Sequence, residues 1–213
     1  MKISYQIVIS SLFLGATTCL FSCTSTTVDK KQVKDAVAKV VLPQPFHVHK
    51  VVEIKPGLTL DILSWGRGAK SAAAYLILRS DSLNNEYKSI TGELDGKITD
   101  AWNMDMDSDG NPEVFIQAVG TEKDHYLSLY VYEFSENGSY KELKFPDLTN
   151  STKKLYRGKD LLYIKDGSLF REFSLFDESD TAGTKPTGKK LLEYSIRGNS
   201  FSVNEIKTDK KAD

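Results

Sequence analysis

The sequence Asp105-Met106-Asp107-Ser108-Asp109-Gly110-Asn111-Pro112-Glu113-Val114-Phe115-Ile116 joins an acidic turn to an apolar run. Its alternating carboxylates, a glycine that can turn the chain and a further carboxylate at the end describe an oxygen-lined loop that leads into a strand. On both sides of this stretch, apolar and polar residues alternate with the period of half-buried strands. The stretch and its surroundings therefore predict an all-β fold.

The same period of two marks a series of strands along the chain, separated by turn dipeptides. Asp95-Gly96, Asn137-Gly138 and Asp166-Gly167 are typical hairpin turns, and each predicts that the strands beside it pair. We expect a single domain over residues 46–207, folded as an antiparallel β-sandwich or a strongly curved antiparallel sheet. The predicted strands are 58–63, 74–78, 87–94, 98–102, 113–119, 127–134, 140–145, 161–164, 169–176, 191–196 and 201–206.

The first residues resemble the export signal of a bacterial lipoprotein. A short basic start and an apolar segment end in Leu20-Phe21-Ser22-Cys23, which fits a lipobox whose cysteine thiol accepts a diacylglyceryl group. We expect a signal peptide at 1–22, a lipidated Cys23, a tether over 23–45 and a charged tail at 208–213. The bacterial cell envelope is the expected location, at the periplasmic or outer-membrane face, with contact to the membrane through the lipid only. An ordinary signal peptide that contains two cysteines remains the alternative.

The charge balance argues against nucleic-acid binding, and the cysteine content argues against disulfide bonds. The 28 basic and 29 acidic side chains nearly balance, so nothing in the net charge recruits nucleic acid. Cys19 lies within the predicted signal, and lipidation consumes Cys23. The exported chain therefore has no cysteine pair to oxidise, and its hydrophobic core must hold it together.

The acidic loop has two interpretations. Asp105, Asp107 and Asp109 stand at positions 1, 3 and 5 of a calcium loop, and Gly110 supplies the sharp bend. Asn111 would offer its backbone carbonyl and Glu113 its carboxylate. An EF-hand needs a glutamate at position 12, where this chain has Ile116, so the expected ion is a structural Ca²⁺ that fixes the loop to the following strand. The alternative is a solvated turn without a metal.

Four segments in order resemble the PliI family, the periplasmic inhibitors of I-type (invertebrate-type) lysozyme. The resemblance covers about residues 98–206 and implies an antiparallel β-sandwich-like fold and a protein that inhibits an enzyme. The segments are Asp107-Ser108-Asp109-Gly110-Asn111-Pro112-Glu113-Val114-Phe115-Ile116, Leu155-Tyr156-Arg157-Gly158-Lys159-Asp160, Leu169-Phe170-Arg171-Glu172-Phe173-Ser174-Leu175-Phe176 and Pro186-Thr187-Gly188-Lys189-Lys190-Leu191-Leu192-Glu193-Tyr194.

In that family a hairpin loop with a Ser-Gly-Ser-Tyr-like core inserts into the lysozyme cleft. The corresponding loop here is residues 119–126, in which Gly120 and Tyr126 match the family's glycine and tyrosine and a longer charged segment replaces the small core. A lysozyme cleft combines a carboxylate pair with sugar subsites. We therefore expect Tyr126 to fill a subsite, Thr121 and His125 to donate hydrogen bonds, and Lys123 to lie near a carboxylate. An exposed hairpin tip without a partner is the alternative.

The function predicted from the sequence is thus that of an envelope lipoprotein that binds and inhibits a lysozyme, with the I-type class favoured, and that is not an enzyme. The alternative is a non-inhibitory, calcium-stabilised surface-binding or structural lipoprotein of the same fold. An envelope hydrolase is the least favoured of the three functions, because the sequence identifies no nucleophile–base pair and no catalytic carboxylate pair. A homodimer formed through an edge strand stays open.

Overall fold

The computed structural model describes residues 41–67, 74–121 and 125–207, which form twelve strands and one short helix. The predicted signal peptide, Cys23, the greater part of the predicted tether and the predicted tail at 208–213 lie outside the described residues. Among the residues that are described, no helix has the length and apolar character needed to cross a membrane.

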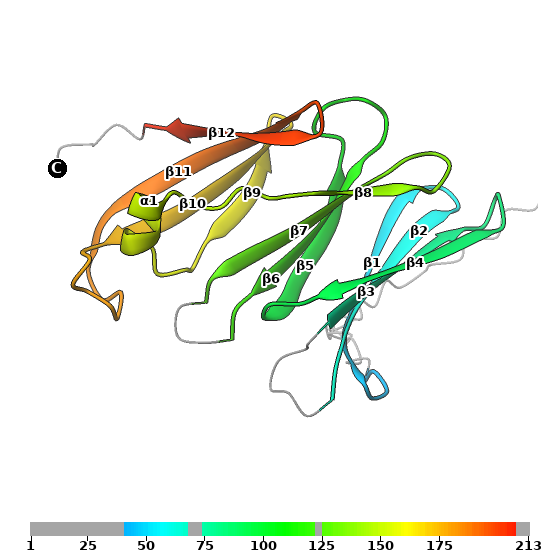
Figure 1. Ribbon diagram of the computed structural model, residues 1–213, viewed down its shortest axis with the longest axis horizontal. Coiled ribbons are helices and arrows are strands. Elements are labelled where there is room, and N and C mark those ends of the chain that lie inside the picture. Colours follow the sequence, from blue (N-terminus) through cyan, green and yellow to red (C-terminus); the bar gives the residue numbers. More distant parts are fainter. Residues whose placement is uncertain (1–40, 68–73, 122–124, 208–213) are drawn as a thin grey trace, which may run out of the picture. The chain divides into compact units, whose positions relative to one another are not determined.

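The strands form three antiparallel four-stranded sheets, whose order can be followed in Figure 1. Each sheet contains strands that are consecutive in the chain. The N-terminal sheet has β1 (Phe46–Lys55), β2 (Leu58–Trp65), β3 (Ala74–Asp81) and β4 (Glu86–Glu93). The central sheet has β5 (Lys97–Met104), β6 (Glu113–Val119), β7 (Leu127–Phe134) and β8 (Tyr140–Leu143). The C-terminal sheet has β9 (Leu161–Lys165), β10 (Ser168–Phe176), β11 (Pro186–Arg197) and β12 (Ser200–Ile206).

Three of the connecting turns have the backbone that their residues favour. Asp166 and Gly167 both have positive φ, at 50° and 78°, and join β9 to β10 in a tight hairpin. Gly198 and Asn199, at 53° and 63°, do the same for β11 and β12. Asn137-Gly138 turns β7 into β8 as predicted. Positive φ at consecutive positions matches the twist of the flanking strands, which explains why Asp166-Gly167 and Gly198-Asn199 close hairpins. In the Asn137-Gly138 turn only Gly138 has positive φ, at 72°.

The hairpin predicted at Asp95-Gly96 is wrong. β4 pairs with β3 and β5 pairs with β6, so this dipeptide carries the chain from the N-terminal sheet to the central sheet. A Cβ atom on Gly96 would lie 2.3 Å from the carbonyl oxygen of Val119. The glycine is needed because the connection passes directly over the end of β6.

β6 lies in the middle of the packing, and nearly all of its side chains are buried. Val114, Ile116 and Ala118 belong to a core shared with the N-terminal sheet. Phe115 points the other way, stacks on Trp102 with ring centroids 5.4 Å apart, and belongs to a core shared with the C-terminal sheet. Successive residues of a strand face opposite sides, so the run Val114-Phe115-Ile116 contributes to both cores.

The prediction of an all-β antiparallel fold is confirmed, and the sandwich has three sheets. The sequence did not predict helix α1 (Asn150–Leu155), which has six residues and lies between β8 and β9. Thr149 caps it, and its side-chain oxygen accepts a hydrogen bond from the Thr152 amide. A single turn of this length has too few residues for a helical period to emerge.

Candidate functional site

The loop between β6 and β7, residues 120–126, has a closed neck. The Gly120 amide donates to the Tyr126 carbonyl at 2.8 Å, directly beyond the last pairing of the two strands. His125 has a φ of 45°, which turns the chain back toward the neck. Its Nδ1 lies 3.3 Å from the Gly120 carbonyl oxygen. The neck therefore holds the start and the end of the loop together.

The residues predicted to bind a partner lie around this neck. Thr121 and His125 are exposed, and Gly120 is half-buried. Tyr126 is 45% exposed, one of four exposed large aromatic side chains among the described residues, with Trp65, Tyr87 and Tyr140. Lys123 lies outside the described residues. The structure thus brings Gly120, Thr121, His125 and Tyr126 together at one end of the central sheet.

Tyr126 rests on Tyr156, a buried residue at the C-terminal end of α1. The ring centroids are 5.2 Å apart with an angle of 31° between the planes. The amide of Leu127 donates to the Tyr156 hydroxyl at 3.3 Å. These contacts tie the base of the loop to the segment that links the central and C-terminal sheets.

Beneath Tyr156 lies a buried ion pair. Arg171 Nε donates to Asp160 Oδ1 at 2.6 Å, and the two side chains are only 5% and 1% exposed. The Tyr156 hydroxyl donates to the other oxygen of Asp160 and accepts from Arg171 Nη2 at 3.1 Å. The guanidinium also lies 5.3 Å from the ring centroids of Tyr156 and Phe173. Every charge in the group is therefore paired and hydrogen-bonded, which is the condition for burying charge at an acceptable cost.

Burial and neighbouring charges determine the protonation states of Tyr156 and Arg171. Burial raises the pKa of the Tyr156 phenol well above its ordinary value, and the Asp160 carboxylate raises it further. For Arg171, burial alone would lower the pKa, but Asp160 and Tyr156 outweigh it and the net direction is upward. Near neutral pH Tyr156 is consequently a neutral hydrogen-bond donor and Arg171 a cation.

Tyr156, Asp160 and Arg171 lie within the segments that resemble the PliI family, but the sequence predicted no role for them in the site. One signal was available. Arg171 stands between Leu169 and Phe173 on the inward-facing positions of β10, where all three side chains are buried. A charge in an apolar alternation needs a buried partner. The alternation does not say which acid supplies it, since Asp160 comes from a turn before β9.

A hollow of about 440 Å³ opens beside the loop base. Apolar side chains form much of its wall, and Asp147 and Lys153 place opposite charges at it. Such a combination of apolar wall and a few polar groups is typical of surfaces that receive a ligand or a partner side chain. Its other wall residues include Tyr126, Leu129, Phe145, Leu148, Tyr156 and Arg171.

The acidic loop gathers three of its carboxylates. One oxygen from each of Asp105, Asp107 and Asp109 lies within 4.8 Å of the others, which is the spacing of groups that share a cation. Asp105 accepts from the amides of Asp109 and Gly110, at 3.2 and 3.1 Å. Asp107 Oδ1 is buried and has no hydrogen-bond partner among the described residues. Hard carboxylate oxygens in this arrangement fit Ca²⁺.

The two remaining predicted ligands, Asn111 and Glu113, make hydrogen bonds within the loop. Asn111 donates from its amide to Asp109 Oδ1 at 2.7 Å and so shapes the turn. Glu113 is fully buried, and its Oε2 accepts from the Met106 amide at 2.8 Å. Burial raises the pKa of Glu113 to about 7, and the charges of Asp107 and Asp105 add to the shift. Its Oε1 has no hydrogen-bond partner among the described residues. Glu113, the first residue of β6, thereby ties Met106 of the loop to that strand, and it does not belong to the group of three aspartates.

The fold and these features together define an all-β protein that presents one closed loop and one acidic turn. Comparison of the chain with protein-family models, with curated proteins and with solved structures finds no match. The candidate site consequently stands on its own geometry.

Proposed function

We propose that this protein is an envelope lipoprotein that binds a lysozyme, with the I-type class favoured, and inhibits it by inserting the loop at 119–126 into the active-site cleft. The observation that carries the proposal is the presentation of Tyr126. A large aromatic side chain is 45% exposed beside a closed loop neck and rests on Tyr156, whose hydroxyl is hydrogen-bonded to a buried ion pair. An aromatic anchor held in its binding conformation loses little entropy on association.

The architecture of residues 97–206 supports the same proposal. In this range the central and C-terminal sheets pack face to face, which is the two-sheet sandwich that the resemblance to the PliI family implies. The N-terminal sheet packs on the opposite face of the central sheet and leaves the β6–β7 loop out of its core. A fold alone does not decide an activity, so the loop chemistry has to carry it.

The chemistry of the loop suits a glycosidase cleft. Such a cleft positions two carboxylates beside subsites that bind sugar rings. Tyr126 would occupy a sugar subsite, Thr121 and His125 would donate hydrogen bonds, and Lys123 would approach a carboxylate. Inhibition of this kind needs no turnover, so the proposal assigns no catalytic residue and treats the protein as a binder rather than an enzyme.

The proposed location rests on the N-terminal lipoprotein signal that the sequence predicts. Lipidation at Cys23 would hold the domain at the cell envelope, where a lysozyme from outside meets the cell wall. The membrane would contact the acyl chains alone, and the polar residues after Cys23 would give the domain reach.

The test is a titration of residues 24–213 into I-type lysozyme acting on bacterial cell walls, with c-type and goose-type lysozymes run in parallel. We expect stoichiometric loss of I-type activity. Tyr126→Ala should weaken inhibition by about 30-fold or more, as for other aromatic anchors. Tyr87→Ala is the matched control, because Tyr87 is 67% exposed on β4 of the N-terminal sheet. No inhibition of any class, or equal effects of the two substitutions, would reject the proposal.

The grouping of Asp105, Asp107 and Asp109 favours a second candidate, a calcium-stabilised surface-binding lipoprotein that inhibits nothing. Calcium at 100 times its dissociation constant should then stabilise the fold by about 2.7 kcal/mol. Asp107→Asn should abolish the gain in melting temperature, and Asp166→Asn, in the β9–β10 turn, should preserve it. A melting temperature that does not respond to calcium would leave the loop as a solvated turn.

A further inference from the structure

The N-terminal sheet contains a buried arginine whose hydrogen-bonding capacity is largely unused. Arg79 lies on β3 and is 2% exposed. Its Nη2 donates to Asp81 Oδ2 at 3.1 Å. Its Nε and Nη1 are buried and have no hydrogen-bond partner among the described residues. A buried guanidinium normally has its N–H groups paired, because leaving them without acceptors costs free energy.

The two carboxylates beside Arg79 leave its Nε and Nη1 without a hydrogen-bond acceptor. Asp81 is already shared, since its two oxygens also accept from the amide and the side chain of Asn84, each at 3.1 Å. Glu86 Oε2 lies 3.6 Å from Nη1, which is an ion-pair distance rather than a hydrogen bond. The Glu86 side chain is 46% exposed, so solvent screens this pair.

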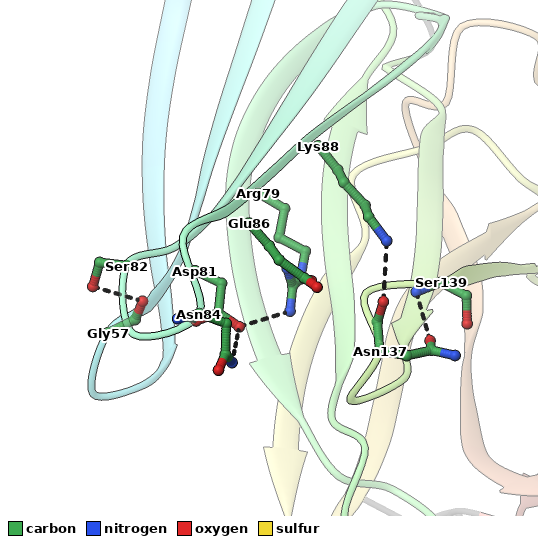
Figure 2. Close-up of polar contacts among 9 residues, drawn as sticks. All are labelled: Gly57, Arg79, Asp81, Ser82, Asn84, Glu86, Lys88, Asn137 and Ser139. Atoms are coloured by element: carbon green, nitrogen blue, oxygen red, sulfur yellow. Dashed lines mark hydrogen bonds and ion pairs between the residues drawn. The ribbon is translucent and has the colours of Figure 1, made fainter.

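A second cation stands close to Arg79 at the β7–β8 turn. Lys88 Nζ donates to the Asn137 carbonyl at 3.0 Å, a contact drawn in Figure 2. Gly138 lies between the two charges: a Cβ atom there would be 2.8 Å from Lys88 Nζ and 3.2 Å from Arg79 Nη1. Lys88 thus adds a second positive charge near Arg79, where Asp81 and Glu86 supply the negative charges.

Arg79 also forms part of the wall of a cavity of about 210 Å³ between the β1–β2 turn, the acidic loop and the end of β7. Lys55 lies at the same cavity and is exposed, with no ion pair among the described residues. Glu136 is an acid at the wall. The apolar part of the wall consists of Ile54, Leu58, Pro112 and Phe134.

We propose that this cavity is a binding site for a small carboxylate on a short apolar chain, with Arg79 as its main ligand and Lys55 as a second cation at the cavity. A guanidinium donates well to planar oxyanions, and Arg79 lies at the cavity wall with two nitrogens that have no acceptor among the described residues. Because protein atoms cover both nitrogens, binding would require the Arg79 side chain to turn toward the cavity. The apolar wall would cover a hydrocarbon chain, which a phosphate lacks. The site is separate from the β6–β7 loop and does not depend on the proposed inhibition.

The test is a titration of the full-length chain with sodium butyrate at constant ionic strength, followed through the side-chain Nε–H signal of Arg79 in ¹H–¹⁵N spectra. We expect a saturable shift of that signal. Butyramide, which has the same shape without the charge, should produce none, and inorganic phosphate should bind at least about tenfold more weakly. Equal binding of phosphate would overturn the carboxylate class, and no saturation with butyrate would mean that the cavity holds only water.

Variants make the assignment specific. Lys55→Gln should weaken butyrate binding by about threefold to tenfold, and Glu86→Gln should strengthen it because it removes a competing negative charge. Lys97→Gln, an exposed lysine on β5 away from the cavity, is the matched control and should leave the affinity unchanged. Arg79→Lys lacks the Nε–H signal, so its binding is followed through the backbone amide signals of Gly110 and Asn111 at the cavity wall. In this variant the butyrate-dependent shift of those signals should be lost while the spectrum keeps the dispersion of a folded protein. If Lys55→Gln and Lys97→Gln behave alike, the proposed position of the site is wrong.

Discussion

At the scale of single residues, Arg171 shows how this fold supports an exposed loop with a buried charge. The guanidinium is enclosed by Asp160 and the rings of Tyr156 and Phe173, and Tyr156 in turn supports Tyr126. The orientation of the loop base thus depends on an ion pair that solvent does not reach. A substitution at Arg171 should therefore alter the position of Tyr126, although no hydrogen bond described above joins the two residues.

Replacing Arg171 with Met should destabilise the protein by about 3–5 kcal/mol, because Asp160 would be left as an unpaired buried charge. Urea unfolding measures the difference. Lys189→Met is the matched control: Lys189 also pairs with a glutamate of β10, Glu172, at 2.7 Å, but its side chain is 66% exposed. That variant should unfold close to the wild-type midpoint. Similar losses for both variants would mean that burial does not govern the strength of these pairs.

Glu113 predicts a pH dependence of stability. Its pKa in the folded protein is about 7, against an ordinary value of 4.5, so the folded state holds this proton more tightly than the unfolded chain. Below the ordinary value both states are protonated and nothing is lost. Between pH 5 and 7 stability falls as pH rises, at no more than about 1.4 kcal/mol per pH unit from this group.

Glu113→Gln should remove that slope, because a glutamine keeps an acceptor for the Met106 amide and does not ionise. Urea unfolding at a series of pH values, in a buffer that contains a calcium chelator, measures it. A variant with the same decline between pH 5 and 7 as the wild type would show that another group is responsible.

At the scale of the elements, turn chemistry decided which predictions succeeded. The bounds of β6 and β7 are those predicted, and the turns at Asn137, Asp166 and Arg197 close hairpins. Asp95-Gly96 has the same chemistry, but β5 finds its partner in β6 instead. A dipeptide specifies that the chain turns. It does not specify whether the next strand stays in the same sheet, since distant packing decides that.

For the candidate site, too, the sequence predicted the local features and missed the contacts between distant residues. The loop at 119–126 and the three aspartates of the acidic turn follow from local sequence. The link from Arg171 to Asp160 joins residues of different elements, and the unpaired nitrogens of Arg79 depend on the geometry around β3 and the β7–β8 turn. No local pattern reports such contacts.

Two glycines test the conformational argument for hairpin turns. Neither Gly167 nor Gly188 would have a neighbour within 4 Å of an added Cβ atom, but Gly167 has a φ of +78° and Gly188 lies in the extended strand β11. Gly167→Ala should cost about 1 kcal/mol, whereas Gly188→Ala should gain about 0.5 kcal/mol by restricting the unfolded chain. Thermal unfolding of the pair measures both. A loss at both positions would contradict the argument, since only one backbone is strained.

At the scale of the whole described domain, β6 makes two cores depend on one strand. Phe115 packs toward the C-terminal sheet, whereas Val114 and Ile116 pack toward the N-terminal sheet. Damage to one side of β6 therefore reaches the other through the backbone and its ladder of hydrogen bonds. The sheets should unfold together rather than as separate layers.

Phe115→Ala should lower the free energy of unfolding by about 3–5 kcal/mol. Amide hydrogen exchange should accelerate in the slowest-exchanging positions of all three sheets, including β2 and β3, although Phe115 belongs to the core on the other side. Leu83→Ala, a substitution of a side chain that is 75% exposed, is the control and should leave exchange unchanged. Acceleration confined to the central and C-terminal sheets would show that the N-terminal sheet is stable independently.

The order of strands has a further consequence for how the chain acquires its structure. Every hydrogen-bonded pair of neighbouring strands joins strands that are also consecutive in sequence. A polypeptide that emerges amino-terminus first from a narrow channel could complete its first sheet before β5 has appeared. Each described strand pairs with a strand next to it in the sequence, so its pairing does not depend on a segment far along the chain. Such a topology keeps the contact order low and shortens the time during which unpaired strand edges are exposed to other chains.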